Sequence, residues 1–340
     1  MTIVDVRAVQ PEAPDAPQDW RTWMGQILVR VETADGLCGY GVGGGGLAGI
    51  HVVHTALKTL LLGQDASAVE TLWQRMYRAT LPYGQKGLAL MAISGVDLAL
   101  WDVRAKRAGQ PLVALLGGQS GQPVPCYRTA WSPEDLIAAR STGFRAVKLQ
   151  VGKYDAAGAI AQIRQVREAV GPDVRLMTDA FMSWDVDTAL RAADGLARYD
   201  VGWLEEPLPI DDLEGYERLR RDSPVPIAGG EHEYTAAAFE MWMQRGFFTV
   251  VQPDVCWCGG LTELLKIYQL AQRYGIKVCP HRGAEVWSLH AIAALDAAPL
   301  AESGRPWMTW VGGQPAIEQG MIRLTHEPGF GVHFDAALWA

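Results

Sequence analysis

The sequence lacks the features that mark several large classes of protein. No apolar run approaches the roughly 20 residues that a membrane-spanning helix needs, so no membrane association is expected. The net charge is −8, with 30 basic and 38 acidic residues, and this balance argues against a nucleic-acid partner. The first residues, MTIVDVRAV, show neither the basic segment nor the apolar core of a secretory signal, so we expect a cytoplasmic protein.

Cysteine is scarce and odd in number. The chain has five cysteines, and Cys256 and Cys258 are one residue apart, which is the wrong spacing for a common zinc knuckle or redox pair. We therefore expect reduced thiols. Two further motifs are missing where the second half of the chain begins, at CYRTAWSPED: the Gly-rich phosphate loop of an open doubly wound sheet, and the His-x-His of metal-dependent hydrolase barrels.

Residues 1–120 have the pattern of an α+β domain. Alternating apolar residues in TIVDVRAV and QILVRVET predict strands, and Asp35-Gly36 predicts a hairpin turn. Helical patterns follow over 47–62, after Ser67, and over 88–109. The stretch LLGGQSGQPVP, rich in Gly and Pro, then reads as a linker.

From Pro123 onward, short apolar segments alternate with helix-length segments. This alternation predicts a parallel sheet with covering helices, an α/β fold. Eight such units in about 190 residues favour a (β/α)8-type barrel over an open doubly wound sheet. The predicted strands are 123–130, 146–152, 174–180, 201–208, 225–231, 248–255, 277–283 and 300–303.

Polar residues stand near the end of seven of these eight strands. In a parallel barrel these ends meet on one face, which is where such barrels place their active sites. From the third strand to the seventh, successive polar residues are 23 to 27 residues apart, which is about one β/α unit. The set, in chain order, is Lys148 and Gln150, then Asp179, Glu205, Glu231, Asp254, His281 and Glu302.

Three neighbouring strand ends carry carboxylates. Asp179, Glu205 and Glu231 would repel one another unless a cation lay between them, and all-oxygen ligation favours Mg²⁺, then Mn²⁺, then Ca²⁺. Glu206 should point away from Glu205, because neighbouring strand residues face opposite sides, and we expect it to support the site from behind.

Several stretches resemble the enolase superfamily, mandelate racemase subgroup, and within it acid-sugar dehydratases of the L-rhamnonate dehydratase type. They are VGPDVRLMTDAFMSWDV, WLEEPLPIDDLEGYERLR, GGEHEY, VVQPDVCWCGGLTE and VCPHRGAEVWSLH. The resemblance implies a capping domain over 1–120, a barrel over 121–314 and a C-terminal segment, 315–340, that returns to the capping domain. It also implies a symmetric homo-oligomer.

The resemblance assigns roles residue by residue. Asp179, Glu205 and Glu231 match the metal ligands, and Asp254 and His281 match an Asp–His dyad in which His281 is the base. Glu302 matches a carboxyl group that donates a hydrogen bond to the substrate carboxylate, and Lys148 matches a lysine that neutralises its charge. The implied reaction is the Mg²⁺-dependent dehydration of a sugar acid to a 2-keto-3-deoxy acid.

Departures from the pattern leave alternatives open. Racemases of the subgroup carry a second lysine where Gln150 stands, and glutamine has no titratable proton, which disfavours racemisation or epimerisation but leaves it as an alternative. Gln150, Arg282 and His232 are the candidates for substrate contact. The stretch Gly41–Gly49 is expected to form a mobile loop over the barrel mouth. A non-catalytic barrel that binds a metabolite is the remaining alternative.

Overall fold

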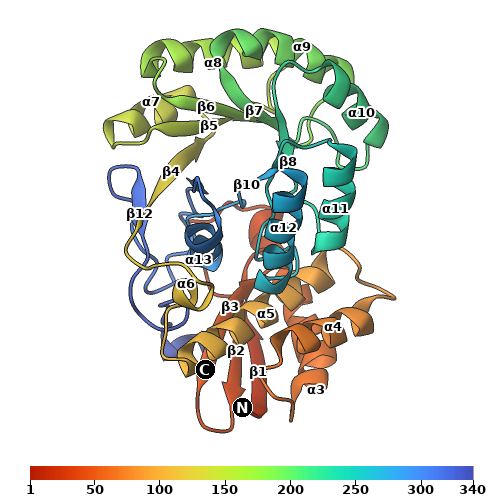
Figure 1. Cartoon of the computed structure of the whole chain (residues 1–340), viewed down its shortest axis with the longest axis vertical. Coiled ribbons are helices and arrows are strands. Elements are labelled where there is room, and N and C mark those ends of the chain that lie inside the picture. Colours follow the sequence, from red (N-terminus) through yellow and green to blue (C-terminus); the bar gives the residue numbers. More distant parts are fainter. Residues whose placement is uncertain (340) are drawn as a thin grey trace.

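The computed structural model describes residues 1–339 and shows two parts packed against each other (Figure 1). One part is an α+β capping domain, drawn in red and orange. The other is a barrel of parallel strands with helices outside, drawn from yellow through green to blue. The N-terminus lies on the side of the capping domain in this view.

Eight parallel strands form the barrel, in the hydrogen-bonded order β10-β9-β8-β7-β6-β5-β4-β11. The predicted fold class and all eight predicted strands are confirmed. The strands are β4 (Pro123–Ala130), β5 (Ala146–Gln150), β6 (Arg175–Asp179), β7 (Val201–Glu205), β8 (Ile227–Gly229), β9 (Val250–Val251), β10 (Lys277–Val278) and β11 (Ala301–Glu302).

The interior of the barrel is a packed core to which every strand contributes. One buried side chain from each strand, or from the residue beside it, forms a single apolar cluster: Tyr127, Ala146, Met177, Trp203, Ala228, Val250, Cys279 and Leu300. Such a layer is how barrels of this kind fill their centre. Cys279 Sγ also lies 3.5 Å from the Leu300 carbonyl oxygen, so β10 and β11 approach each other across the ends of the ladder.

Seven strands are followed by a helix that covers the barrel. The helices are α7 (Pro133–Ser141), α8 (Ala156–Val170), α9 (Val186–Leu196), α10 (Leu213–Asp222), α11 (Thr235–Arg245), α12 (Leu261–Tyr274) and α13 (Val286–Leu295), and a short 3-10 turn, η2 (Ala197–Tyr199), extends α9. Side chains of Ser132, Asp155, Asp185 and Asp212 cap the first four by accepting a backbone N–H of the first turn.

The eighth strand departs from the expected eight complete units. Within residues 1–339, no helix lies between β11 and the next element, β12 (Met321–Arg323), which pairs antiparallel with β4. The chain instead runs from the barrel mouth toward the capping domain. This route brings Arg305 and Trp307 to the cavity described below.

The capping domain has a three-stranded antiparallel sheet, in the order β1-β2-β3, beside a group of helices. The strands are β1 (Ile3–Val9), β2 (Ile27–Thr33) and β3 (Cys38–Gly43). The helices are α1 (Trp20–Trp23), α2 (Gly46–Val52), the π-helical η1 (Val53–Leu57), α3 (Lys58–Leu61), α4 (Val69–Thr80), α5 (Leu88–Arg107) and α6 (Leu112–Leu115). In α5, 16 of 20 residues are buried, because the helix lies between this sheet and barrel helix α12.

The expectation of a mobile loop over Gly41–Gly49 is wrong. Residues 38–43 are strand β3, and residues 46–52 are helix α2. The glycines permit close packing: a Cβ added to Gly41 would lie 2.2 Å from the Gly95 carbonyl oxygen, and one added to Gly39 would lie 2.2 Å from that of Ala99. These glycines therefore let β3 touch the backbone of α5 and do not supply flexibility.

The C-terminal segment joins the two parts. After β12, the Phe330 N–H donates to Asp102 of α5, and the Phe334 ring packs on Tyr40 of β3. The chain closes with a short 3-10 turn, η3 (Ala336–Trp339). Among the described helices, none is both long and apolar enough to cross a membrane.

Candidate active site

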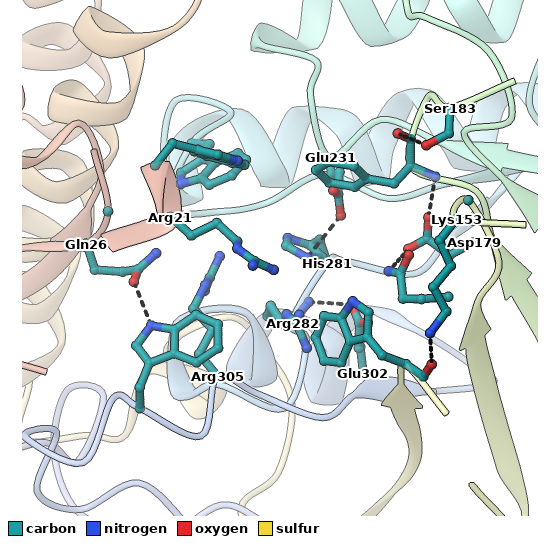
Figure 2. Close-up of a pocket in the computed structure, with 18 residues that line it drawn as sticks. Arg21, Gln26, Lys153, Asp179, Ser183, Glu231, His281, Arg282, Glu302 and Arg305 are labelled. Carbon is teal, nitrogen blue, oxygen red and sulfur yellow. Dashed lines mark hydrogen bonds and ion pairs between the residues drawn. The ribbon is translucent and has the colours of Figure 1, made fainter. Parts of the chain in front are cut away.

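A cavity of about 240 Å³ lies where the carboxyl ends of the barrel strands meet the capping domain (Figure 2). It is lined by polar, charged and aromatic side chains and by two glycines. The barrel supplies Trp131, Gln150, Gly152, Lys153, Asp179, Phe181, Ser183, Glu231, Trp257, His281, Arg282 and Glu302, and the segment after β11 supplies Arg305 and Trp307. The capping domain supplies Trp20, Arg21, Gly25 and Gln26.

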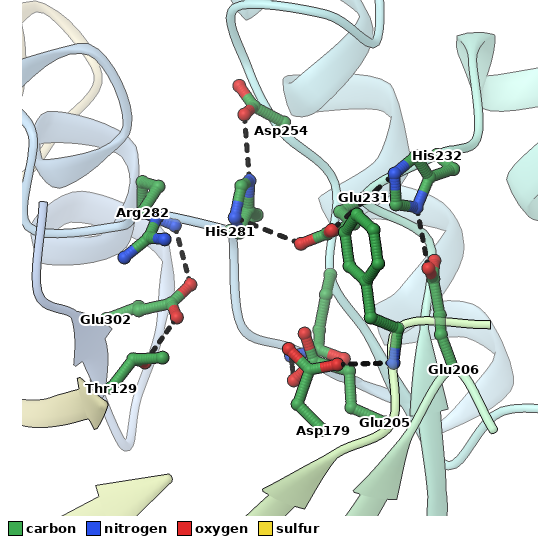
Figure 3. Close-up of polar contacts among 12 residues, drawn as sticks. Thr129, Asp179, Glu205, Glu206, Glu231, His232, Asp254, His281, Arg282 and Glu302 are labelled. Atoms are coloured by element: carbon green, nitrogen blue, oxygen red, sulfur yellow. Dashed lines mark hydrogen bonds and ion pairs between the residues drawn. The ribbon is translucent and has the colours of Figure 1, made fainter. Parts of the chain in front are cut away.

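The three predicted carboxylates stand on adjacent strands. Asp179 ends β6 and pairs in register with Glu205 at the end of β7, and Glu231 follows β8. All three are buried, with 2, 1 and 6 % of their surface exposed. Figure 3 shows them grouped near His281. The sequence spacing thus placed them correctly on one face of the barrel.

Lys148, on β5, lies among these carboxylates. Its Nζ is 2.7 Å from Glu205 Oε2, 3.1 Å from Glu302 Oε1 and 3.3 Å from Asp179 Oδ2. Burial disfavours the charged amine, but the surrounding carboxylates outweigh burial and raise the pKa of Lys148 well above its usual value. A lysine held charged in this way neutralises anions and is a poor base.

The charge of Lys148 does not satisfy all three carboxylates. Burial and mutual repulsion raise the pKa of Asp179 and of Glu205. Burial alone would also raise the pKa of Glu231, but His281 and His232 outweigh it and hold that pKa well below its usual range. Excess negative charge in a buried, oxygen-rich group is what a hard divalent cation such as Mg²⁺ would neutralise, so the donor set fits that ion.

A second group of possible ligands overlaps the first. Oxygen and nitrogen atoms of Glu206, Glu231 and His232 lie within 4.8 Å of one another. Glu206, however, already accepts from the Gly230 N–H at 2.9 Å and contacts His232 Nδ1 at 2.6 Å. Asp179 and Glu231 line the cavity, whereas Glu206 and His232 do not, so this position favours the support of Glu231 over a direct contact with the cation.

His281 and Asp254 form the predicted dyad. His281 Nδ1 lies 2.8 Å from Asp254 Oδ2, and His281 Nε2 lies 3.0 Å from Glu231 Oε2. Burial lowers the pKa of His281, but Glu231 and Asp254 outweigh burial and raise it to about 10 while Glu231 carries no cation. A cation held by Glu231 would offset the larger of these two effects and lower the pKa of His281, so that the imidazole could accept a proton. The imidazole therefore stands between the dyad carboxylate and the carboxylate cluster, with Nε2 toward the cavity.

Arg305 is the main functional residue that sequence reasoning missed. Its Nη2 donates to Asp254 Oδ2 at 2.6 Å, the oxygen that also contacts His281, and its Nη1 donates to Glu285 Oε2 at 2.6 Å. It is 7 % exposed and lines the cavity. It lies in a segment without regular structure, so no strand or helix period pointed to it. The doublet Arg305-Pro306, which precedes Trp307 and Trp310, has no pattern that predicts a place in the active site.

Glu302 ends β11 and is fully paired. Its carboxylate accepts from Thr129 Oγ1 at 2.5 Å and from the Arg282 backbone N–H at 2.9 Å. Burial would raise its pKa, but Lys148, Arg282 and His281 outweigh burial and place the pKa well below its usual range. The surroundings favour a hydrogen-bond acceptor, so the donor role implied by the resemblance would need a proton that this arrangement disfavours.

The three predicted substrate-binding residues fall in different places. Gln150 lines the cavity and donates through Nε2 to Asp179 Oδ2 at 2.6 Å, so it also orients a carboxylate. Arg282 lines the cavity, with Nη1 3.2 Å from the Ser303 carbonyl oxygen. His232 is not among the lining residues; its ring lies between Glu206 and Glu231 and packs on Phe181. That position favours support over substrate contact.

Comparisons with known proteins cover nearly the whole chain. Residues 134–338 match the family described as Enolase C-terminal domain-like, and residues 6–117 match the Mandelate racemase / muconate lactonizing enzyme, N-terminal domain. An L-rhamnonate dehydratase from Saccharopolyspora erythraea is 39% identical over an alignment of 330 positions, which covers 92% of this chain and 84% of that protein.

Two solved structures are also similar to this chain over nearly its whole length. The 3,6-anhydro-D-galactonate cycloisomerase from Zobellia galactanivorans aligns with a TM-score of 0.90 at 31% identity, over 99% of this chain and 98% of that one. The L-talarate dehydratase from Polaromonas sp. JS666, complexed with Mg and L-glucarate, aligns with a TM-score of 0.88 at 30% identity, over 99% and 96%. Each likeness spans the capping domain as well as the barrel.

Proposed function

The chain belongs to the enolase superfamily, in the group with the mandelate racemase/muconate lactonizing enzyme N-terminal domain, and on this premise we propose that it is a Mg²⁺-dependent dehydratase of sugar acids. The dehydratases among its relatives act on L-rhamnonate and L-talarate, by their names, and the second was solved with Mg and L-glucarate. A small-molecule sugar acid is therefore the proposed partner. Assembly into a homo-oligomer stays a prediction.

The observation that carries the proposal is the position of His281. Its Nε2 faces the cavity 3.0 Å from Glu231, while Asp254 holds its Nδ1. A substrate carboxylate bound beside Asp179, Glu205 and Glu231 would bring its α-carbon within reach of this nitrogen. When bound, Mg²⁺ would neutralise the charge that develops on the carboxylate oxygens as the α-proton leaves.

The chain's own groups then divide the work. Lys148 adds positive charge next to the substrate carboxylate. His281 takes the α-proton, and the same imidazolium can return that proton to the departing 3-hydroxyl, giving water and a 2-keto-3-deoxy acid. This single acid/base suffices when the proton and the hydroxyl lie on the same face of the substrate.

Racemisation is disfavoured because, among residues 1–339, the cavity offers no second base opposite His281. It requires a second group that delivers a proton to the face away from His281, and the residue at the strand end there is Gln150, whose amide donates to Asp179. Lys148 is held charged by carboxylates on all sides.

The test is a screen of sugar acids with Mg²⁺, with keto-acid formation as the readout. We expect turnover by the natural protein, none above background by His281→Asn, and none when the divalent cation is removed with a chelator. Keto acid from no sugar acid of the panel, or turnover by His281→Asn near that of the natural protein, would contradict the proposal.

A further inference from the structure

Two guanidinium groups reach the cavity from opposite parts of the chain. Arg21 belongs to helix α1 of the capping domain, and Arg282 follows β10 of the barrel. Figure 2 shows Arg21 directed from the capping segment into the space in front of His281, and Arg282 at the barrel side of the same space. The proposed function gives neither of them a role.

Arg282 is held in a strained position with unused donors. Its φ is +54°, a left-handed conformation that L residues adopt at an energetic penalty and that glycine adopts freely. A guanidinium has five N–H donors, yet its one side-chain hydrogen bond is from Nη1 to the Ser303 carbonyl oxygen. Its Nε is buried without a partner among residues 1–339. An unpaired buried donor on a strained residue calls for a ligand.

Arg21 is held in place through some of its N–H donors, and others have no partner among residues 1–339. Asp19 caps helix α1 and binds Arg21 through Nε and Nη2, which fixes one edge of the guanidinium. Within the described chain, Nη1 has no hydrogen-bond partner and remains available to the cavity, whose lining includes Arg21. A carboxylate-held guanidinium is a pre-oriented binding group, because little freedom is lost when a second anion arrives.

The other cations of the cavity are already engaged. Arg305 is bound by Asp254 and Glu285, and Lys153 Nζ donates to the Trp131 carbonyl oxygen at 3.1 Å. Lys148 is surrounded by carboxylates below the cavity. Arg21 and Arg282 are thus the guanidinium groups with donors to spare.

We infer that the substrate is a dicarboxylic sugar acid, an aldarate, whose second carboxylate is bound by Arg21 and Arg282. This inference rests on the proposed function, which places the first carboxylate at Asp179, Glu205 and Glu231. An aldonate, which ends in a hydroxymethyl or methyl group, would bring no anion to Arg282 or to the Nη1 of Arg21 that is unpaired in the described chain. A carboxylate matches their paired N–H geometry.

The experiment compares six-carbon aldarates with the aldonates of matching configuration, each with Mg²⁺. We expect kcat/KM for the best aldarate to exceed that for its matched aldonate by about 100-fold, the discrimination that a lost charged hydrogen-bond pair gives. Arg21→Gln and Arg282→Gln should each lower kcat/KM for the aldarate by roughly 10- to 100-fold and change the aldonate value less than about threefold. Arg7→Gln, on the exposed face of β1, is the matched control and should change neither.

Arg282→Gly separates the role of the side chain from folding. Glycine accepts the left-handed backbone, so the melting temperature of this variant should be equal to or above that of the natural protein. Its preference for the aldarate should still be lost. The inference would be overturned if kcat/KM for the matched aldonate equalled that for the aldarate. It would also be overturned if the arginine variants lowered kcat/KM equally for both substrates.

Failure of the proposed function is distinguishable from failure of this inference. If no acid yields keto acid, the dehydratase proposal is wrong. The dicarboxylate inference is then tested by substrate binding alone. His281→Asn with Mg²⁺ is then titrated with aldarates and aldonates, and the melting temperature is followed. A larger rise with aldarates that disappears in the Arg21→Gln and Arg282→Gln backgrounds supports the dicarboxylate site. Equal rises with both acids overturn it.

Discussion

At the scale of single residues, Glu205 and Glu206 are adjacent in the chain but have different proposed roles, the first as a cation ligand and the second as a support for the ligands. Glu205 is buried and accepts from Lys148 and Gln252, and Glu206 contacts His232. We predict that Glu205→Gln, which keeps the shape but removes the charge, weakens Mg²⁺ binding more than about 100-fold. Glu206→Gln should weaken it only about 10-fold, as expected for a residue behind the ligands. Calorimetric titration with Mg²⁺ measures both.

The ranking of these two variants decides between the two candidate ligand groups. If Glu206→Gln proved the more damaging, the group of Glu206, Glu231 and His232 would be the cation site, and the assignment of Asp179 and Glu205 would be wrong.

Arg305 also acts at the residue scale, through Asp254. We predict that Arg305→Met lowers the free energy of unfolding by about 3 kcal/mol, because it leaves the buried carboxylates of Asp254 and Glu285 without their cation. It should also lower kcat by on the order of 10-fold or more with little change in KM, since the group displaced is the one that orients His281.

Two further variants separate these effects. Arg305→Lys should restore part of kcat, and adding Glu285→Gln to Arg305→Met should restore part of the stability without restoring kcat. A proportionate recovery of both by the second variant would mean that Arg305 serves stability alone. Denaturant unfolding and steady-state kinetics provide the two readouts.

At the scale of elements, the glycines of β3 determine how closely the capping sheet approaches α5. We predict that Gly41→Ala lowers the free energy of unfolding by roughly 2–3 kcal/mol, because the added methyl meets the Gly95 carbonyl oxygen at 2.2 Å. Gly36→Ala is the comparison: Gly36 has a positive φ, +81°, but a Cβ added there meets nothing within 4 Å, so about 1 kcal/mol is expected. A loss for Gly41→Ala no larger than that for Gly36→Ala would mean that the close contact with α5 does not require glycine at position 41.

The same element shows where sequence reasoning stops. Apolar strands that alternate with helices, and caps such as Ser132, are local patterns, so all eight barrel strands could be predicted from the sequence. Polar strand ends such as Asp179 and His281 could be predicted too, because a barrel brings them to one face. The role of Gly41 depends on α5, more than 45 residues away along the chain, and no local pattern reveals such a contact.

The unpredicted part of the site has the same origin. Arg305, Trp307 and Arg21 reach the cavity from segments with little or no regular structure, whose course depends on tertiary packing. Arg282 could be identified only because it directly follows the predicted base. Loops on a rigid scaffold carry such residues without a periodic pattern.

At the scale of the whole molecule, His290 connects the barrel, the capping domain and the C-terminal segment. It lies on α13, accepts the Val113 N–H on Nδ1 at 2.9 Å, and its Nε2 is 3.4 Å from the Phe330 carbonyl oxygen. Burial lowers the pKa of His290 to about 4, so the folded protein holds it neutral. The unfolded chain binds the proton near pH 6.5, and stability from this group is therefore complete above pH 6.5 and falls as the pH drops toward 4.

We predict that this histidine contributes acid sensitivity of up to about 3 kcal/mol between pH 7 and pH 4. His290→Gln should be less stable at pH 7 but should lose less stability on acidification, whereas His51→Gln, at an exposed position of α2, should follow the natural protein. Unfolding free energies at pH 7, 6, 5 and 4 test this. Parallel curves for the natural protein and His290→Gln would assign the acid sensitivity to other groups.

The central claim is that one base, His281, removes the α-proton and expels the 3-hydroxyl. The measurement that tests it most directly is turnover of the sugar acid with Mg²⁺ in D₂O, with product and recovered substrate followed by NMR. The account predicts a 2-keto-3-deoxy product, and recovered substrate with either no α-deuterium or α-deuterium with retained configuration. Inverted, deuterated substrate formed at a rate near that of turnover would contradict it, because a second base would then face His281 across the cavity.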